Sequence, residues 1–233
     1  YTVNDDNQNI EQLVSWDVSD MLVNYGLVCG SVTIGGESGD DNTKLSADKD
    51  LLKKSLTEFV KLRNEFGIVR TETTLDSCAD LFAQGKLAYT ITDVSHINTI
   101  AESGISYGVC SIPALSDDMQ IEKISENLCA FVNPYSSDVQ TAKAVANALS
   151  YDYAAAVNST TGLLSSRTIS INSKEYKDTY GKIYEIYSTA DVKAKFMGAA
   201  YFYTKFDIML HQVWDGTDIE TSVNSFLSEL KVQ

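Results

Sequence analysis

The 233-residue sequence predicts an α/β fold that ends in a layer of helices. Three observations lead to this prediction. Single strands alternate with amphipathic helices along the first half of the chain, helices alone fill its end, and one short segment combines a helix end, a glycine and a strand. Alternation of strand and helix is typical of a sheet that is covered by helices.

The most informative segment covers residues 81–93. Phe82 is expected to be the last buried residue of a helix, and Gly85 supplies the left-handed residue that commonly ends one. From Leu87 to Thr92, apolar side chains alternate with smaller or polar ones, which is the period of a strand. Such a strand delivers three polar residues to its carboxyl end, where open α/β sheets bind ligands. They are Asp93, Ser95 and His96.

The elements before this segment follow from hydrophobic spacing and glycine. Residues 10–25 carry apolar side chains at intervals of three and four, which predicts a helix. The glycine-rich, β-branched stretch 27–39 predicts a short hairpin or loop. Residues 46–66 have a broad apolar face, so a helix is expected there, with Ser46 as its N-cap and Gly67 as its stop.

The remaining elements are expected from the same signals. They are helices over 74–84 and 97–103, strands over 107–112 and 128–132, a helix over 141–151, and three final helices over 173–188, 191–214 and 217–232.

The chain is acidic, with 32 Asp and Glu against 18 Lys and Arg and a net charge of −14. This argues against nucleic acid and anionic membranes as partners, because both require clustered Lys and Arg. The negative net charge favours neutral or cationic small molecules as ligands. The alternative is that the acidity only keeps a secreted protein soluble. No apolar run reaches the roughly 20 residues of a membrane span. The start at Tyr1 is interpreted as that of a segment processed from a longer protein.

Cysteine and histidine are too sparse and scattered for a metal or cofactor site, so none is predicted. The four cysteines lack C-x-x-C spacing, and only two histidines occur. A disulfide between Cys110 and Cys129 is conceivable because both fall in predicted strands of one region. The alternative is that all four cysteines are buried small hydrophobic residues.

Several short motifs follow one another in an order typical of one protein family. Phe82, Gly85 and Ala88 match an F-x-x-G-x-x-A-M segment, with Tyr89 in place of the Met. Residues 107–113 match Y-G-V-x-x-x-P, residues 142–151 look like an alanine-led amphipathic helix, and 162–166 look like a G-x-L-P-A turn without its proline. The set resembles the family-1 extracellular solute-binding proteins of carbohydrate ABC transporters, which are maltose-binding-protein-like.

The resemblance implies a type II periplasmic-binding-protein-like lobe. Residues 1–112 and 168–233 would form the carboxyl-terminal lobe, and residues 113–167 would belong to the amino-terminal lobe, whose main part lies outside this chain. It further implies a non-enzymatic solute-binding component of an ABC importer, which captures a sugar or oligosaccharide between two lobes and presents it to an ABC permease. The expected location is extracellular or periplasmic, with a lipid anchor in an upstream segment.

Three places offer the aromatic faces, carboxylates and amides that bind sugars. The first is the polar loop 5–11, where the resemblance suggests Asp5 or Glu11 as a ligand contact and helix capping is the alternative. The second is the turn at Asp93, Ser95 and His96, with an exposed turn of no function as the alternative. The third is 201–203, where Tyr201 and Tyr203 are candidates and packing between helices is the alternative.

Two other classes of function stay open at this stage. An enzyme is one, most simply a glycoside hydrolase, although no carboxylate pair stands in a recognisable motif. The string Gly104–Gly108 reads G-x-S-x-G, but its Ser106 precedes a strand instead of separating a strand from a helix. A ligand-sensing module of a surface signalling protein is the other class.

Overall fold

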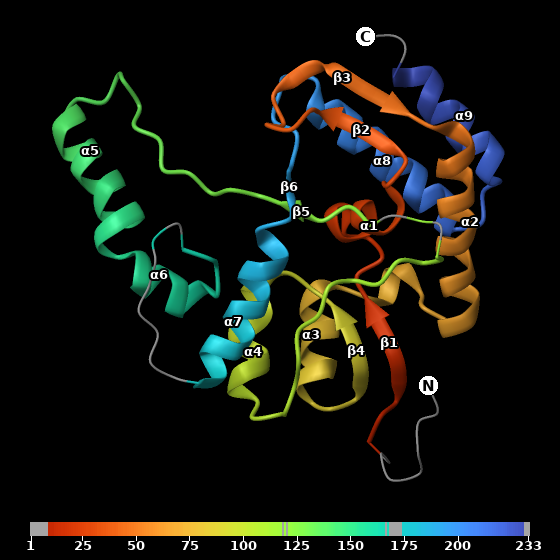
Figure 1. Ribbon diagram of the computed structural model, residues 1–233, viewed down its shortest axis with the longest axis horizontal. Coiled ribbons are helices and arrows are strands. Elements are labelled where there is room, and N and C mark those ends of the chain that lie inside the picture. Colours follow the sequence, from red (N-terminus) through yellow and green to blue (C-terminus); the bar gives the residue numbers. More distant parts are fainter. Residues whose placement is uncertain (1–8, 118, 120, 166, 168–173, 231–233) are drawn as a thin grey trace.

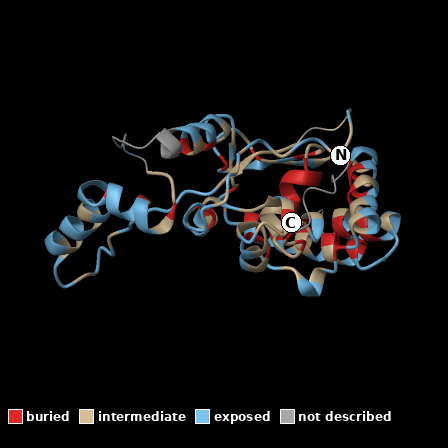
Figure 2. Cartoon of the chain, turned by 90° about the horizontal axis from the view of Figure 1, so that it is seen from below, coloured by how far each residue is buried: buried red, intermediate tan, exposed pale blue. Residues whose placement is uncertain are grey.

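The structure is a computed structural model that describes residues 9–117, 119, 121–165, 167 and 174–230. Most elements form one body, and an arm that contains α5 (Val139–Asn147) and α6 (Ala154–Thr161) extends to one side (Figure 1). Figure 2 shows that buried residues are concentrated in the body, whereas the arm is mostly exposed.

A parallel pair of strands forms the lower part of the body in Figure 1. β1 (Gln12–Trp16) pairs with β4 (Leu87–Ile91), in register from Gln12 opposite Leu87 to Trp16 opposite Ile91. The predicted strand at 87–92 is therefore confirmed. The helix α3 (Leu75–Ala83) packs on both strands, and α2 (Lys49–Phe66) packs against β1. Among the described residues the sheet has only these two strands, so β4 is not the interior strand of a wider sheet.

The predicted helix over 10–25 is wrong in its first half. Residues 12–16 form β1, and the helix α1 covers Met21–Val28, with the Asp20 side chain as its N-cap. A buried parallel strand reads as a continuous apolar run, which cannot be distinguished from a helix face over so few residues. Pairing with β4 decides in favour of the strand.

The hairpin expected within 27–39 is present but extends further. β2 (Val32–Gly35) and β3 (Asp41–Ala47) are antiparallel, and β3 includes Ser46. The N-cap of α2 is therefore Asp48, not Ser46: its carboxylate accepts hydrogen bonds from the N–H groups of Asp50 and Leu51. The helix ends at Gly67 in the left-handed conformation, as predicted.

The two final helices, α8 (Ala199–Trp214) and α9 (Ile219–Leu230), pack on α2 and complete the main core. Aromatic rings fill this core. Phe202 stacks on Phe206 with centroids 5.8 Å apart, and Phe226 meets both rings edge to face. The helix expected over 191–214 is corrected at its start, where Asp191–Val192 form the short strand β6.

The strands expected over 107–112 and 128–132 do not form, because a strand requires a partner and no described residue pairs with either segment. Instead, β5 (Ile124–Ser125) pairs in parallel with β6. The cysteines on these segments, Cys110 and Cys129, are exposed free thiols, so no disulfide joins them. Cys29 and Cys78 are also free and are buried.

The helices expected around the arm are largely confirmed. The prediction over 141–151 corresponds to α5 and to a wider helical turn at Ala148–Asp152 that leads to α6. The helix α4 (Ile97–Glu102) follows the short helical turn Val94–His96, and α7 covers Lys174–Tyr187. A second small core, formed by Ile97, Tyr180 and Ile183, joins α4 to α7.

The end of α6 lies closely against the helical turn Val94–His96 at a glycine. Gly162 has φ of +73°, and a Cβ at this position would lie 2.5 Å from the carbonyl oxygen of Val94. We expect Gly162→Ala to lower the free energy of unfolding by about 1–3 kcal/mol more than Gly85→Ala, because it adds a steric conflict to the backbone strain. Gly85 is the matched control, with the same φ and nothing within 4 Å of its added Cβ. Urea unfolding followed by circular dichroism measures both losses, and equal losses would contradict the close packing.

Candidate ligand-binding site

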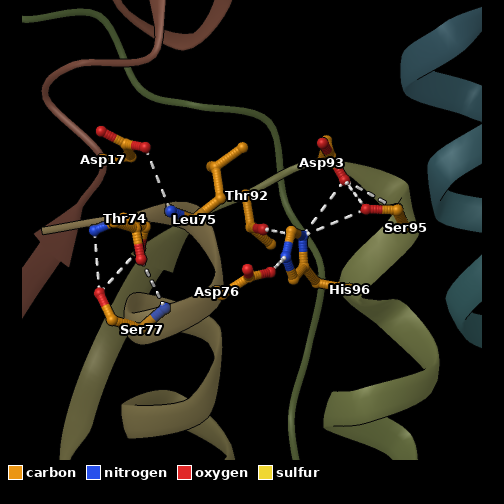
Figure 3. A network of polar contacts seen from close by, with 9 residues as sticks. All are labelled: Asp17, Thr74, Leu75, Asp76, Ser77, Thr92, Asp93, Ser95 and His96. Carbon is orange, nitrogen blue, oxygen red and sulfur yellow. Dashed lines mark hydrogen bonds and ion pairs between the residues drawn. The ribbon is translucent and has the colours of Figure 1, made fainter.

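A group of polar side chains lies where β1 and β4 end (Figure 3). Because the strands are parallel, their carboxyl ends meet at one edge, and each is followed by a polar turn. The turn after β1 covers 17–20, and the turn after β4 covers 92–96. The start of α3 lies between them and contributes Asp76. We call this group the polar edge, and its members are Asp17, Asp20, Asp76, Thr92, Asp93, Ser95 and His96.

Asp17 and Asp20 fix the turn after β1. One oxygen of Asp17 accepts the N–H of Ser19 at 2.8 Å, and the other accepts the N–H of Leu75 at 3.2 Å, which ties the turn to the start of α3. Asp20 accepts the N–H of Val23 at 2.8 Å and caps α1. Burial raises the pKa of Asp20, and the negative charges of Asp17 and Asp93 raise it further. The carboxylates of the two turns therefore act on one another.

His96 connects the turn after β4 to α3. Its Nε2 lies 2.9 Å from Oδ1 of Asp76, and its Nδ1 lies 3.0 Å from Oγ1 of Thr92 and 3.2 Å from Oδ1 of Asp93. Only 12% of the side chain is exposed. Figure 3 shows the ring between Asp76 on one side and Asp93 with Ser95 on the other. The ring is thus held in one orientation at the edge.

The polar edge is suited to binding hydroxyl groups. Its carboxylates accept hydrogen bonds, and its hydroxyl groups both donate and accept. The Ser95 hydroxyl donates to Oδ1 of Asp93 at 2.5 Å, while its distance to Nδ1 of His96 is 3.4 Å, so the carboxylate is its closer partner. Ser106 of the G-x-S-x-G string lies in an irregular segment without the strand and helix of a nucleophile elbow.

The structure brings together Asp93, Ser95 and His96 at the carboxyl end of a strand, as the sequence predicts. Asp5 lies outside the described residues. Glu11 is at the amino end of β1, where its N–H donates to the Lys86 carbonyl at 2.9 Å and its carboxylate pairs with Nζ of Lys86 at 3.0 Å. It therefore lies at the opposite end of the strand from the polar edge.

Sequence reasoning missed Asp17, Asp20 and Asp76. The missed carboxylates of the first turn directly follow the apolar run Leu13–Trp16, and Asp20 stands three residues before Val23 as an N-cap does. This signal was available, but it is hidden once residues 10–25 are interpreted as one helix.

The two tyrosines of α8 lie in different surroundings. Tyr203 is 6% exposed, its hydroxyl accepts the N–H of Ala194 at 3.0 Å, and its ring meets Tyr25 edge to face at 5.6 Å. This arrangement corresponds to packing, the alternative left open for Tyr203. Tyr201 is 38% exposed, and Nζ of Lys205 lies 5.4 Å from the centre of its ring.

A shallow hollow of about 340 Å³ adjoins the turn after β1. Arg63 and Arg70 lie on its rim, but both are engaged. Arg70 holds Asp215 with two hydrogen bonds of 3.1 and 2.6 Å, and Nη1 of Arg63 donates to the carbonyl of Trp214 at the end of α8. These arginines stabilise helix ends, and the hollow adds no free charge to the polar edge.

The described residues contain no group of three or more His, Cys, Asp or Glu side chains placed to hold a metal ion. None of their helices combines the length and the apolar character that a membrane span requires.

Comparison with known proteins rests on structure. No family model matches the sequence, and no curated protein matches it either. A maltotriose-binding protein of Thermus thermophilus, solved with maltotriose, superposes with a TM-score of 0.72 over 94% of this chain at 14% identity. The maltose-maltodextrin-binding protein of Alicyclobacillus acidocaldarius gives 0.72 over 97% at 14% identity. The chain has the type II periplasmic-binding-protein fold.

A third structure, a cyclo/maltodextrin-binding protein complexed with maltotetraose, superposes with a TM-score of 0.66 over 99% of this chain at 16% identity. The predicted fold class is thereby confirmed, and such low identities establish the fold alone. The chain spans only 60–63% of the length of these three proteins.

Proposed function

We propose that this chain is part of an extracellular or periplasmic solute-binding protein that delivers a sugar or oligosaccharide to an ABC permease. The observation that carries the proposal is the polar edge at the carboxyl ends of two parallel strands, in a fold whose structural neighbours are named for maltotriose, maltodextrin or maltotetraose. In α/β sheets this is the edge where ligands bind. Capture of the sugar involves no covalent chemistry. The proposal also includes a lipid anchor that lies outside this chain.

The polar edge provides both kinds of partner that a sugar hydroxyl needs. Asp17 and Asp93 offer carboxylate oxygens, and the hydroxyls of Thr92 and Ser95 lie beside them. The imidazole of His96 holds these groups in place, because its Nε2 lies 2.9 Å from Oδ1 of Asp76 and its Nδ1 lies 3.0 Å from Oγ1 of Thr92. Asp5 and Tyr201 stay candidate contacts.

We further propose that the arm belongs to a second lobe. In this division residues 1–112 and 168–233 form one lobe, and residues 113–167 contribute to the other. Between residues 128 and 157, large apolar side chains are exposed to an extent rare in a complete domain, with Leu128 at 81%, Phe131 at 90% and Tyr135 at 93%. The neighbours are longer than this chain, which supports a covering lobe formed by sequence outside it.

Titration calorimetry with maltotriose tests the site in a longer protein that includes the proposed second lobe. We expect His96→Ala and Asp93→Asn each to weaken binding by about 10–100-fold, because the first removes the ring that orients Asp76, Thr92 and Asp93 and the second removes a carboxylate at the ligand. Chromatography should recover the sugar unchanged, as a binding protein requires.

Glu11→Gln is the matched control, since it alters a carboxylate at the other end of β1 and should leave the affinity unchanged. A loss of affinity in Glu11→Gln, with none in His96→Ala, would place the ligand at the amino end of β1 and contradict this proposal. Hydrolysis of the sugar would favour the glycoside hydrolase instead.

A further inference from the structure

A buried asparagine supports the turn after β1, which carries Asp17 and Asp20 of the polar edge. Asn24 belongs to α1 and is 1% exposed. Its Oδ1 accepts the indole N–H of Trp16 at 3.0 Å, and its Nδ2 donates to the carbonyl oxygens of Asp20 at 2.6 Å and of Asp17 at 3.4 Å. One amide group therefore joins the last residue of β1 to both ends of the turn.

Packing alone does not account for an amide at this position. The apolar residues that follow Asn24 on α1 lie in the main core. A buried polar group lowers stability unless its hydrogen bonds are made, and asparagine is a weaker helix former than leucine or alanine. Here the NH2 group of the side chain has two backbone carbonyls of the turn as its partners. The shape of the turn is therefore what the amide determines.

The turn is held at two points. The Asp17 carbonyl, to which Asn24 donates, also accepts the N–H of Asp20 at 3.1 Å, and this bond closes the turn. The two carboxylate oxygens of Asp17 accept the N–H groups of Ser19 and of Leu75, the second of which is drawn in Figure 3. Each of these oxygens keeps a second lone pair for a ligand. The orientation of the Asp17 carboxylate thus depends on the backbone that the amide holds.

We propose that Asn24 is a positioning residue of the sugar site, which fixes the turn 17–20 so that the Asp17 carboxylate is presented to the ligand at the polar edge. Its own side chain is buried and hydrogen-bonded, so it acts through the turn and not by contact with the sugar. Loss of its NH2 group should change the shape of the turn while the core persists. This inference rests on the proposed function, because that proposal places the ligand at the polar edge.

Asn24→Asp tests the NH2 group alone, because it keeps the size of the side chain and an oxygen for the Trp16 N–H. Burial and the nearby carboxylates should raise the pKa of the introduced carboxyl group. When it is protonated, this group can still donate to the Asp20 carbonyl, and when it is ionised, it faces that carbonyl without a donor. Relative to the unmodified longer protein at the same pH, we expect the affinity for maltotriose to fall about 10–100-fold at pH 8 and to recover to within about threefold at pH 5.

The Ser19 amide reports on the turn without any sugar, since its N–H donates to the Asp17 carboxylate at 2.8 Å. Its resonance, measured by NMR on the 233-residue chain, should shift in Asn24→Asp at pH 8 and return toward its unmodified position at pH 5. Asn158→Asp is the matched control, because it makes the same change at another buried asparagine, whose Nδ2 donates to the Leu163 carbonyl at 2.6 Å. It should leave the Ser19 resonance in place at both pH values.

A double variant tests whether Asn24 acts through Asp17. In the Asp17→Asn background, Asn24→Asp should cause little further loss of affinity at pH 8, because residues that act as one unit are not additive. Circular dichroism establishes that each variant is folded. If Asn24→Asp is unfolded at pH 8, Trp16→Phe replaces it: this change removes only the N–H partner of the amide and should weaken binding about three- to tenfold.

Three results would overturn the positioning role. They are an unchanged affinity in Asn24→Asp at pH 8 or in the Trp16→Phe replacement, a loss that does not recover at pH 5, and fully additive losses in the double variant. These results leave the proposed function standing if His96→Ala still weakens binding. If the unmodified longer protein does not bind maltotriose, the proposed function fails and the role in a sugar site fails with it. The Ser19 resonance then decides separately whether Asn24 holds the turn.

Discussion

Replacement of Tyr203 by alanine is expected to lower the free energy of unfolding by about 3–5 kcal/mol, the usual cost of truncating a buried aromatic side chain. The ring is packed between Tyr25 and Phe202, and its hydroxyl is the partner of a buried backbone N–H at Ala194. A loss of this size is a large fraction of the 5–15 kcal/mol that typically stabilises a domain. Urea unfolding followed by circular dichroism measures it.

Two comparisons separate packing from hydrogen bonding at this position. Tyr203→Phe keeps the ring and leaves the Ala194 N–H unpaired, so we expect a smaller loss of about 1–3 kcal/mol. Tyr201→Ala, two residues earlier on the same helix, changes an exposed ring and should cost less than about 1 kcal/mol. If Tyr203→Ala leaves stability unchanged and instead weakens sugar binding, Tyr203 returns to the ligand site.

The 233-residue chain alone is expected to bind maltotriose at least about a hundredfold more weakly than a longer protein that includes the proposed second lobe, because a ligand held by one wall of a cleft buries too little surface. The comparison is made by titration calorimetry on both proteins under the same conditions. It tests the proposal that residues 113–167 belong to a second lobe.

Size-exclusion chromatography provides the control, because it measures the oligomeric state of the chain. If the chain is a monomer and binds maltotriose with micromolar affinity, it is a complete receptor, and the proposed second lobe is wrong. If it self-associates through the exposed side chains of the arm, the affinity is compared at a concentration where the monomer dominates.

The sequence was most informative where local chemistry decides the structure. Gly67 and Gly85 end helices in the left-handed conformation, and β4 alternates apolar and smaller residues on a short path between α3 and α4. These signals lie within a few residues of the feature they determine. For the same reason Asp93, Ser95 and His96 could be assigned to the carboxyl end of a strand before any tertiary contact was known.

Features that depend on distant partners could not be predicted in this way. Residues 12–16 form a strand because β4 lies beside them, and their apolar spacing alone fits a helix equally well. That single error moved the expected ligand loop from 17–20 to 5–11 and hid Asp17 and Asp20. Conversely, residues 107–112 and 128–132 have the composition of strands, yet no described segment pairs with them.

The parallel pairing of β1 with β4 also has a consequence for synthesis of the chain. Ser15 and Thr90 are in register although 75 positions separate them. At typical translation rates, β4 is therefore synthesised roughly 4–15 s after β1, while the β2–β3 hairpin and α2 can already form. During that interval Leu13, Val14 and Trp16 have no sheet to join. The polar edge is thus a late product of folding on the ribosome, and the nascent chain exposes the apolar side chains of β1 until Ile91 has emerged.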